Sequence, residues 1–121
     1  MRPENRQVGF RIADPLAAQL DRVCRSSMPR ATVVHDAIRR GLELLAADAH
    51  PTISPTAAAA GPHQLRVGFS DGDTDRLQAV RTRITDDSGR PVVRVFVLRE
   101  CLLRGLQQLG AVASPKATAA P

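Results

Sequence analysis

The sequence predicts a mainly helical fold with a two-stranded β-ribbon, built from two copies of one strand-helix-helix unit. The first observation is a repeat, because Val8-Gly9-Phe10 returns as Val67-Gly68-Phe69. Polar or small residues alternate with apolar ones around each of these segments, which is typical of a strand with one buried face. An apolar helical pattern follows each segment, with glycine at a matching position, Gly41 and Gly105. One such unit is too small to bury its own apolar face, so the two copies are expected to pack together.

Both units are expected to form one domain, because the 121 residues of the chain suffice for a single core. Three prolines and a run of alanines lie between the units, and this composition predicts a coil. The expected division is a flexible arm over 1–5, a first unit over 6–47, a linker over 48–63, a second unit over 64–110 and a disordered tail over 111–121.

The first unit begins with a strand over residues 7–12, whose inward face carries Val8, Phe10 and Ile12. A helix is expected to start at Asp14-Pro15, because Asp can cap free N–H groups and Pro fits the first helical position. This helix should end near residues 26–29, since Pro29 disfavours helix at the residue before it. The second helix should begin near residues 31–32, and its broad apolar stripe indicates burial over much of its surface.

The second unit is expected to follow the same order, with a strand over residues 65–70 and a turn over 71–74. The following helix should end before a loop over 86–91. Residues 91–97 are β-branched and alternate, which alone indicates a strand. Alignment of the two copies instead predicts that the last helix starts within this segment, and we adopt that interpretation. Glycine disfavours helix, so the matched pair Gly41 and Gly105 predicts a close helix crossing.

Composition narrows the classes of function. The formal charge is +5, and every basic residue except Lys116 is an arginine, which suits phosphate and guanine edges. The alternative is simply a basic protein from a GC-rich genome. The chain has no Trp or Tyr, which disfavours single-strand binding by base stacking and excludes a tyrosine nucleophile. Cys24 and Cys101 have no CxxC spacing, so neither a disulfide scaffold nor a zinc site is expected. No apolar run is long enough to span a membrane.

No catalytic chemistry is expected. His35, His50 and His63 have no metal-ligand spacing, and the aspartates at 71, 73, 86 and 87 lack the spacing of a calcium loop, so they are interpreted as turn and cap residues. We therefore expect no enzyme activity, no metal, no cofactor and no small-molecule substrate.

The order of strand, short capped helix, loop and a helix reading Ala37-Ile38-Arg39-Arg40-Gly41-Leu42 resembles the ribbon-helix-helix DNA-binding proteins of the Arc and MetJ type. In that family two strands form an antiparallel ribbon that reads the major groove. Two such units in one chain also resemble the TraY-type relaxosome proteins. The resemblance implies a tandem ribbon-helix-helix fold that forms an intramolecular pseudodimer.

The resemblance also implies two sets of DNA contacts. Arginine can bind guanine through two hydrogen bonds, glutamine can bind adenine and serine can bind either edge. The implied base contacts on the outer face of the ribbon are Gln7, Gly9, Arg11, Arg66, Gly68 and Ser70. The starts of the second helices should hold phosphates, through Arg30, Ala31, Thr32, Arg94 and Val95. The family usually has Ser or Thr where Ala31 and Val95 stand, so Arg30 and Arg94 would supply the charge instead. A solvated strand face and a solvated helix start are the alternatives.

The expected function is sequence-specific binding of double-stranded DNA, as a transcriptional repressor in a bacterial cytoplasm, associated with the nucleoid when bound. Several copies are expected to associate on adjacent sites, because one ribbon covers only a few base pairs. An accessory DNA-binding protein of plasmid transfer (conjugation) is the second interpretation. An antitoxin-type protein-interaction module is the third, disfavoured because the tail is short and lacks an apolar helix.

Overall fold

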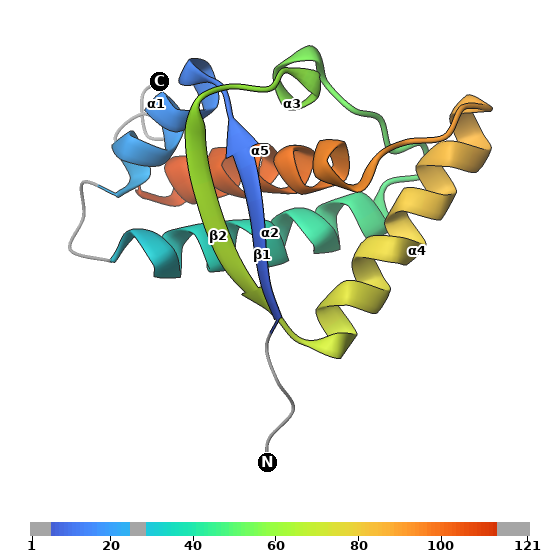
Figure 1. Cartoon of the computed structure of the whole chain (residues 1–121), viewed down its shortest axis with the longest axis horizontal. Coiled ribbons are helices and arrows are strands. Elements are labelled where there is room, and N and C mark those ends of the chain that lie inside the picture. Colours follow the sequence, from blue (N-terminus) through green and yellow to red (C-terminus); the bar gives the residue numbers. More distant parts are fainter. Residues whose placement is uncertain (1–5, 25–28, 114–121) are drawn as a thin grey trace.

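Two antiparallel strands lie across a layer of helices (Figure 1). The computed structural model describes residues 6–24 and 29–113, and the account below refers to these ranges. The prediction of a mainly helical chain with a two-stranded antiparallel ribbon is confirmed. In chain order the elements are β1 (Arg6–Ile12), α1 (Asp14–Val23), α2 (Arg30–Ala47), α3 (Pro55–Ala58), β2 (His63–Phe69), α4 (Asp71–Ser88) and α5 (Arg94–Ala113).

The two strands pair along their whole length, as the repeat predicts. Val8 lies opposite Val67, and the pairs run from Arg6 with Phe69 to Ile12 with His63. Because side chains alternate across a strand, this register gives the ribbon one face toward the helices and one face away from them.

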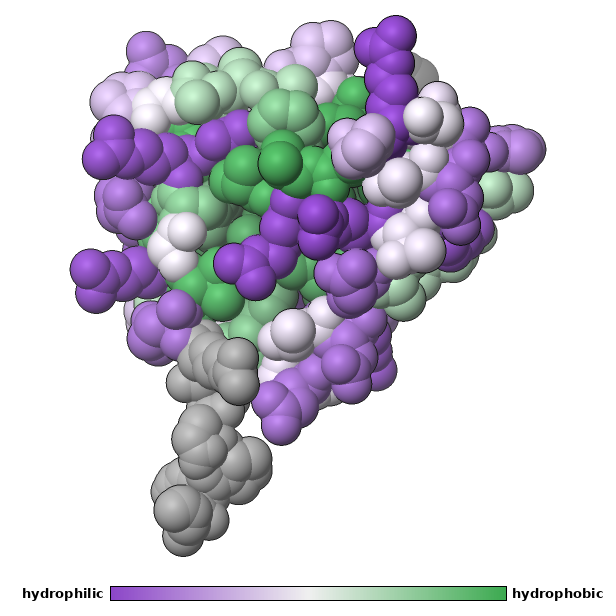
Figure 2. All heavy atoms as spheres, turned by 45° about the vertical axis from the view of Figure 1, so that its right-hand side comes forward, coloured by the Kyte–Doolittle hydropathy of each residue, from purple (hydrophilic) through white to green (hydrophobic). Residues whose placement is uncertain are grey.

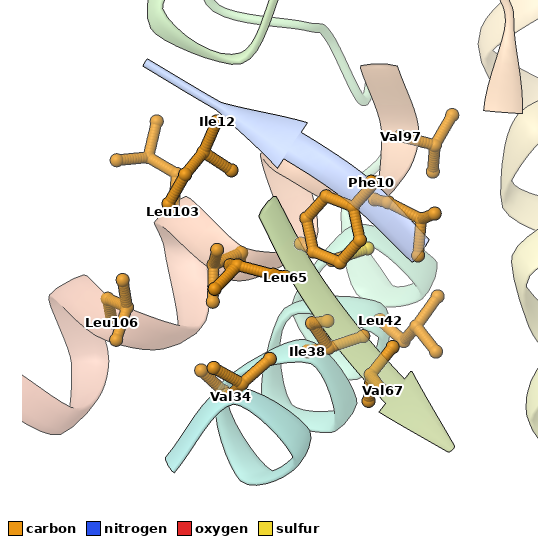
Figure 3. Close-up of a cluster of buried hydrophobic side chains, with 14 of the residues drawn as sticks. Phe10, Ile12, Val34, Ile38, Leu42, Leu65, Val67, Val97, Leu103 and Leu106 are labelled. Atoms are coloured by element: carbon orange, nitrogen blue, oxygen red, sulfur yellow. The ribbon is translucent and has the colours of Figure 1, made fainter. Parts of the chain in front are cut away.

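The inner face of the ribbon forms the top of the core. Figure 3 shows Phe10 and Val67 of the two strands close to the α2 side chains Ile38 and Leu42. Each of these four side chains is at most 4% exposed, and burying one such side chain contributes about 1.5–3 kcal/mol. The other buried side chains on the inner face are Ile12, Leu65 and Phe69, whereas Val8 is only partly buried.

Helices α2 and α5 form the floor of the core and cross at very short range. A Cβ atom added at Gly41 of α2 would overlap the backbone of Cys101 in α5, and one added at Gly105 would overlap the backbone of Ala37 in α2. The predicted close crossing at the two glycines is therefore confirmed.

The first helix starts at Asp14-Pro15, as expected, but Asp14 is not its cap. Its N-cap is Ala13, which has no capping side chain, while Asp14 and Pro15 occupy the first turn. Asp14 is favourable there because the N-terminus of a helix carries partial positive charge. Its Oδ1 also lies 2.7 Å from Nε2 of His63, at the end of the partner strand.

The second unit differs from the prediction at both ends of α4. Residues 71–74, expected as a turn, are its first turn, and the expected loop over 86–91 is helical up to Ser88. Gly89 ends the helix with φ 76° in the left-handed region, which glycine adopts without strain. Helix α5 then begins at Arg94, as alignment of the copies predicts, and not as the strand that its β-branched residues suggest.

The linker packs against α5, and its central part forms α3, so the expectation of a coil is wrong there. Glu100 of α5 is 3% exposed and explains this packing. Its Oε1 accepts hydrogen bonds from the Ser54 backbone N–H (2.8 Å) and the Ser54 hydroxyl (2.9 Å). Its Oε2 accepts one from Nε of Arg104 (2.7 Å), and Arg104 also pairs with Asp48 (3.1 Å). The buried carboxylate thus holds the linker directly at Ser54, and through Arg104 at Asp48.

The predicted tail is partly helical. Residues 111–113 belong to α5, so the expectation of disorder is wrong for them. Helix α1 ends at Val23, before the expected end near residues 26–29. The expected arm over 1–5, residues 26–28 and the rest of the tail over 114–121 lie outside the described residues.

Candidate nucleic-acid interface

The outer face of the ribbon is a polar surface that no described helix covers (Figure 1). Gln7, Gly9 and Arg11 of β1 are exposed on it, as expected, and so is Arg66 of β2. Gly68 is half-buried. These residues alternate with the buried side chains of the same strands, so the burial of the core fixes the direction in which they point.

The two arginines of this face carry charge that the fold does not neutralise. None of the ion pairs among the described residues includes Arg11 or Arg66. The Arg66 side chain forms no hydrogen bond within residues 6–24 and 29–113. Arg11 donates from Nε to Oε1 of Gln64 at 3.4 Å, which is longer than a usual N–H···O bond. Both guanidinium groups are therefore available to an external acceptor.

Gln64 is a residue of this face that the sequence analysis missed. It is exposed and lies opposite Arg11 in the register. A Cβ atom at Gly9 would lie 3.0 Å from its Nε2, so glycine leaves room for the amide to rest across β1. The alternation of Leu65, Arg66 and Val67 continues upstream through Gln64, and this continuation is the signal that could have identified it.

Ser70 does not belong to the outer face, so its predicted placement there is wrong. Strand β2 ends at Phe69, and Ser70 is the N-cap of α4. Its hydroxyl accepts the Asp73 backbone N–H (3.1 Å), and the Asp73 carboxylate accepts the Ser70 backbone N–H (3.2 Å). This reciprocal pair is a capping box, which satisfies two N–H groups at the start of the helix.

The start of α2 presents the first expected phosphate site. Arg30, Ala31 and Thr32 are all exposed, and the N-cap Pro29 has no side chain that could cap their N–H groups. Arg30 pairs with Asp21 at 3.3 Å, and both side chains are more than half exposed. Such a pair contributes little stability, so Arg30 can exchange it for another anion.

The start of α5 is more apolar than that of α2. Arg94 is exposed and has no partner within the described ranges, whereas Val95 is half-buried. Val93, just before the helix, is a large apolar residue that is 51% exposed. Figure 2, in which the side that carries α4 turns forward, shows hydrophobic atoms at the surface between hydrophilic ones. The two expected phosphate sites are therefore unequal in polarity.

Burial raises the pKa of the Cys101 thiol, so this group stays protonated and is a poor nucleophile. Among residues 6–24 and 29–113 no cluster of His, Cys, Asp or Glu could hold a metal ion. Within the same ranges no helix is both long and apolar enough to cross a membrane.

Comparison with known proteins assigns no family. No family model matches the chain, and no curated protein and no solved structure is significantly similar to it.

Proposed function

We propose that this protein binds double-stranded DNA in a sequence-specific manner, with the outer face of the β-ribbon in the major groove. One observation carries the proposal: a two-stranded antiparallel ribbon, backed by helices, presents Arg11 and Arg66 without ion-pair partners on its open face. The major groove, roughly 12 Å wide, admits such a ribbon. Arginine there can bind O6 and N7 of guanine with both arms of its fork.

We further propose that the chain is an intramolecular pseudodimer of two ribbon-helix-helix units. The register supports this, because the matched residues Val8 and Val67 lie opposite each other. Gln7 pairs with Gly68, and their counterparts Arg66 and Gly9 also pair. The crossing of α2 and α5 supports the same relation, because each unit places its glycine against the matching backbone position of the other. These observations fit an approximate twofold axis through the Val8–Val67 pair.

The proposed reading face is asymmetric. Arg11 and Gln64 lie together near one end of the ribbon, whereas the counterpart of Arg11 in the second unit is Ser70, which caps a helix. One molecule would therefore recognise a short sequence without internal symmetry. We propose that neighbouring copies occupy adjacent sites, since one ribbon spans only a few base pairs.

The proposed phosphate contacts flank the ribbon at the starts of α2 and α5. Free backbone N–H groups and the helix dipole favour an anion at such a position. Arg30 and Arg94 would add charge there, with Ala31, Thr32 and Val95 contributing backbone N–H groups. These contacts fix orientation on the duplex and do not read sequence.

The biological role that we propose is transcriptional repression in a bacterial cytoplasm. An accessory role in plasmid transfer would use the same ribbon, and the location of the bound sequence separates the two roles. Binding at the promoter of its own gene indicates a repressor, and binding beside a transfer origin indicates the accessory role.

Selection of bound sequences from random double-stranded DNA tests the proposal. We expect one short asymmetric sequence containing guanines, bound at least about 10³-fold more tightly than unselected DNA. Its affinity should fall steeply with salt, because bound phosphates release counterions. A single-stranded oligonucleotide of the same sequence serves as the control and should compete poorly. No enrichment of any duplex sequence, or equal binding of the single strand, would contradict the proposal.

A further inference from the structure

Arg99 of α5 lies buried beneath the end of β1. Its side chain is 5% exposed. Its Nε donates a hydrogen bond to the main-chain carbonyl oxygen of Arg11 (2.7 Å), and its Nη1 donates to the carbonyl oxygen of Ala57 in α3 (3.4 Å). The guanidinium carbon stands 5.8 Å from the centre of the Phe96 ring. One buried cation therefore connects the floor of the core, the linker and the strand that carries Arg11.

This buried charge has no acidic partner in the described part of the chain. None of the ion pairs there includes Arg99, and burial lowers its pKa. A buried ion without a counter-ion is costly, and an apolar side chain of similar size is often the more stable choice. Packing alone does not explain an arginine at this position. Its hydrogen bond to the Arg11 carbonyl group does.

We propose that Arg99 is a positioning residue for base recognition, which holds the backbone of Arg11 so that its side chain meets one base pair in the correct geometry. This inference rests on the proposed DNA-binding function. In a two-stranded ribbon each strand is an edge strand, and half of its backbone polar groups have no partner in the ladder. Recognition of a base through two hydrogen bonds depends on the orientation of the arginine side chain. A hydrogen bond from the core to the Arg11 carbonyl fixes the backbone there, and this should increase discrimination between base pairs.

The second unit has no equivalent arrangement. The counterpart of Arg11 is Ser70, whose carbonyl oxygen already accepts the backbone N–H (3.0 Å) and the hydroxyl (3.1 Å) of Thr74 in α4. The counterpart of Arg99 is His35, whose side chain forms no hydrogen bond within residues 6–24 and 29–113. The hydrogen bond from a buried arginine to the strand backbone is therefore found, among the described residues, only at the end of the ribbon that carries the exposed Arg11.

The substitution Arg99→Met tests the inference with the full chain and the DNA sequence selected by the unmodified protein. Methionine fills a similar volume without charge, so the domain should fold. The variant Arg11→Ala first identifies the base pair that Arg11 contacts, as the position at which sequence preference is lost. The measured quantity is the ratio of two affinities, one for the selected sequence and one for the same sequence with that base pair changed. This ratio does not depend on the folded fraction, so lost stability alone leaves it unchanged. We expect it to fall roughly five- to tenfold, within the range for one two-bond arginine contact.

Two further variants separate support of Arg11 from a general effect. In an Arg11→Ala background, Arg99→Met should cause no additional loss at that base pair, because the group that it positions is gone. His35→Met, at the matched position of α2, should leave the ratio unchanged. An unchanged ratio in Arg99→Met, or an additive loss in the double variant, overturns the inference and leaves the proposed function standing. Absence of any selected sequence for the unmodified protein overturns both.

Discussion

Replacing Gly41 with alanine should unfold the domain or nearly so. The added methyl group would overlap the carbonyl of Cys101, which belongs to the backbone of α5 and cannot rotate away. Relief requires α2 and α5 to separate, and these helices contribute buried side chains to the whole core. Overpacking typically costs about 1–3 kcal/mol and occasionally more. We expect a loss of at least about 3 kcal/mol here, out of a total of roughly 5–15 kcal/mol for a small domain. Urea unfolding followed by circular dichroism measures it.

Gly110 of α5 provides the matched control. A Cβ atom added there would meet nothing within 4 Å. Alanine is the better helix former, so Gly110→Ala should raise stability by about 0.5–1 kcal/mol. Gly105→Ala should behave like Gly41→Ala, since it would meet the backbone of Ala37. If Gly41→Ala unfolds at the same urea concentration as the unmodified chain, the close crossing is not a feature of the protein.

Removing both outward arginines of the ribbon should abolish specific DNA recognition while preserving the fold. Arg11 and Arg66 are exposed and support no described ion pair. Each two-bond contact to guanine contributes about 1–3 kcal/mol of discrimination. The double variant Arg11→Ala, Arg66→Ala should therefore lose roughly 100-fold or more in affinity for the selected sequence, if the two sites act independently. The variant keeps the proposed phosphate contacts, so weak binding to any duplex should persist. Titration of labelled duplexes measures both affinities.

Arg76→Ala is the control for loss of positive charge. Arg76 is exposed on α4, beside Leu42 and Ala46 of α2, and thus belongs to the helical layer. Its removal should leave sequence preference unchanged. If Arg76→Ala weakens preference as much as either ribbon variant does, recognition does not lie on the outer face of the ribbon.

The repeat made much of this fold predictable from sequence. Alternation around the two Val-Gly-Phe segments identified both strands and the face that each buries. Comparison of the copies placed the start of α5 correctly where β propensity alone suggested a strand, because tertiary packing overrides local preference. The matched glycines Gly41 and Gly105 predicted the helix crossing.

The remaining features depend on contacts between distant residues. The packed linker could not be predicted, since it requires Glu100 to meet Ser54. Ser70 could end a strand or cap a helix, and the capping box that it forms with Asp73, three residues later, favours the cap. The position of Gln64 beside Arg11 follows only from the register. Arg99 looks like an ordinary helix residue until the fold brings it beneath β1.

The central claim is that the outer face of the ribbon meets bases in the major groove. Methylation interference on the selected duplex tests it most directly, because methylation of guanine N7 obstructs the major groove and methylation of adenine N3 obstructs the minor groove. The account predicts that N7 methylation of the guanines contacted by Arg11 and Arg66 prevents binding. Methylation of N3 at adenines beside these guanines should not prevent it. Interference confined to adenine N3 would place the protein in the minor groove and contradict the account.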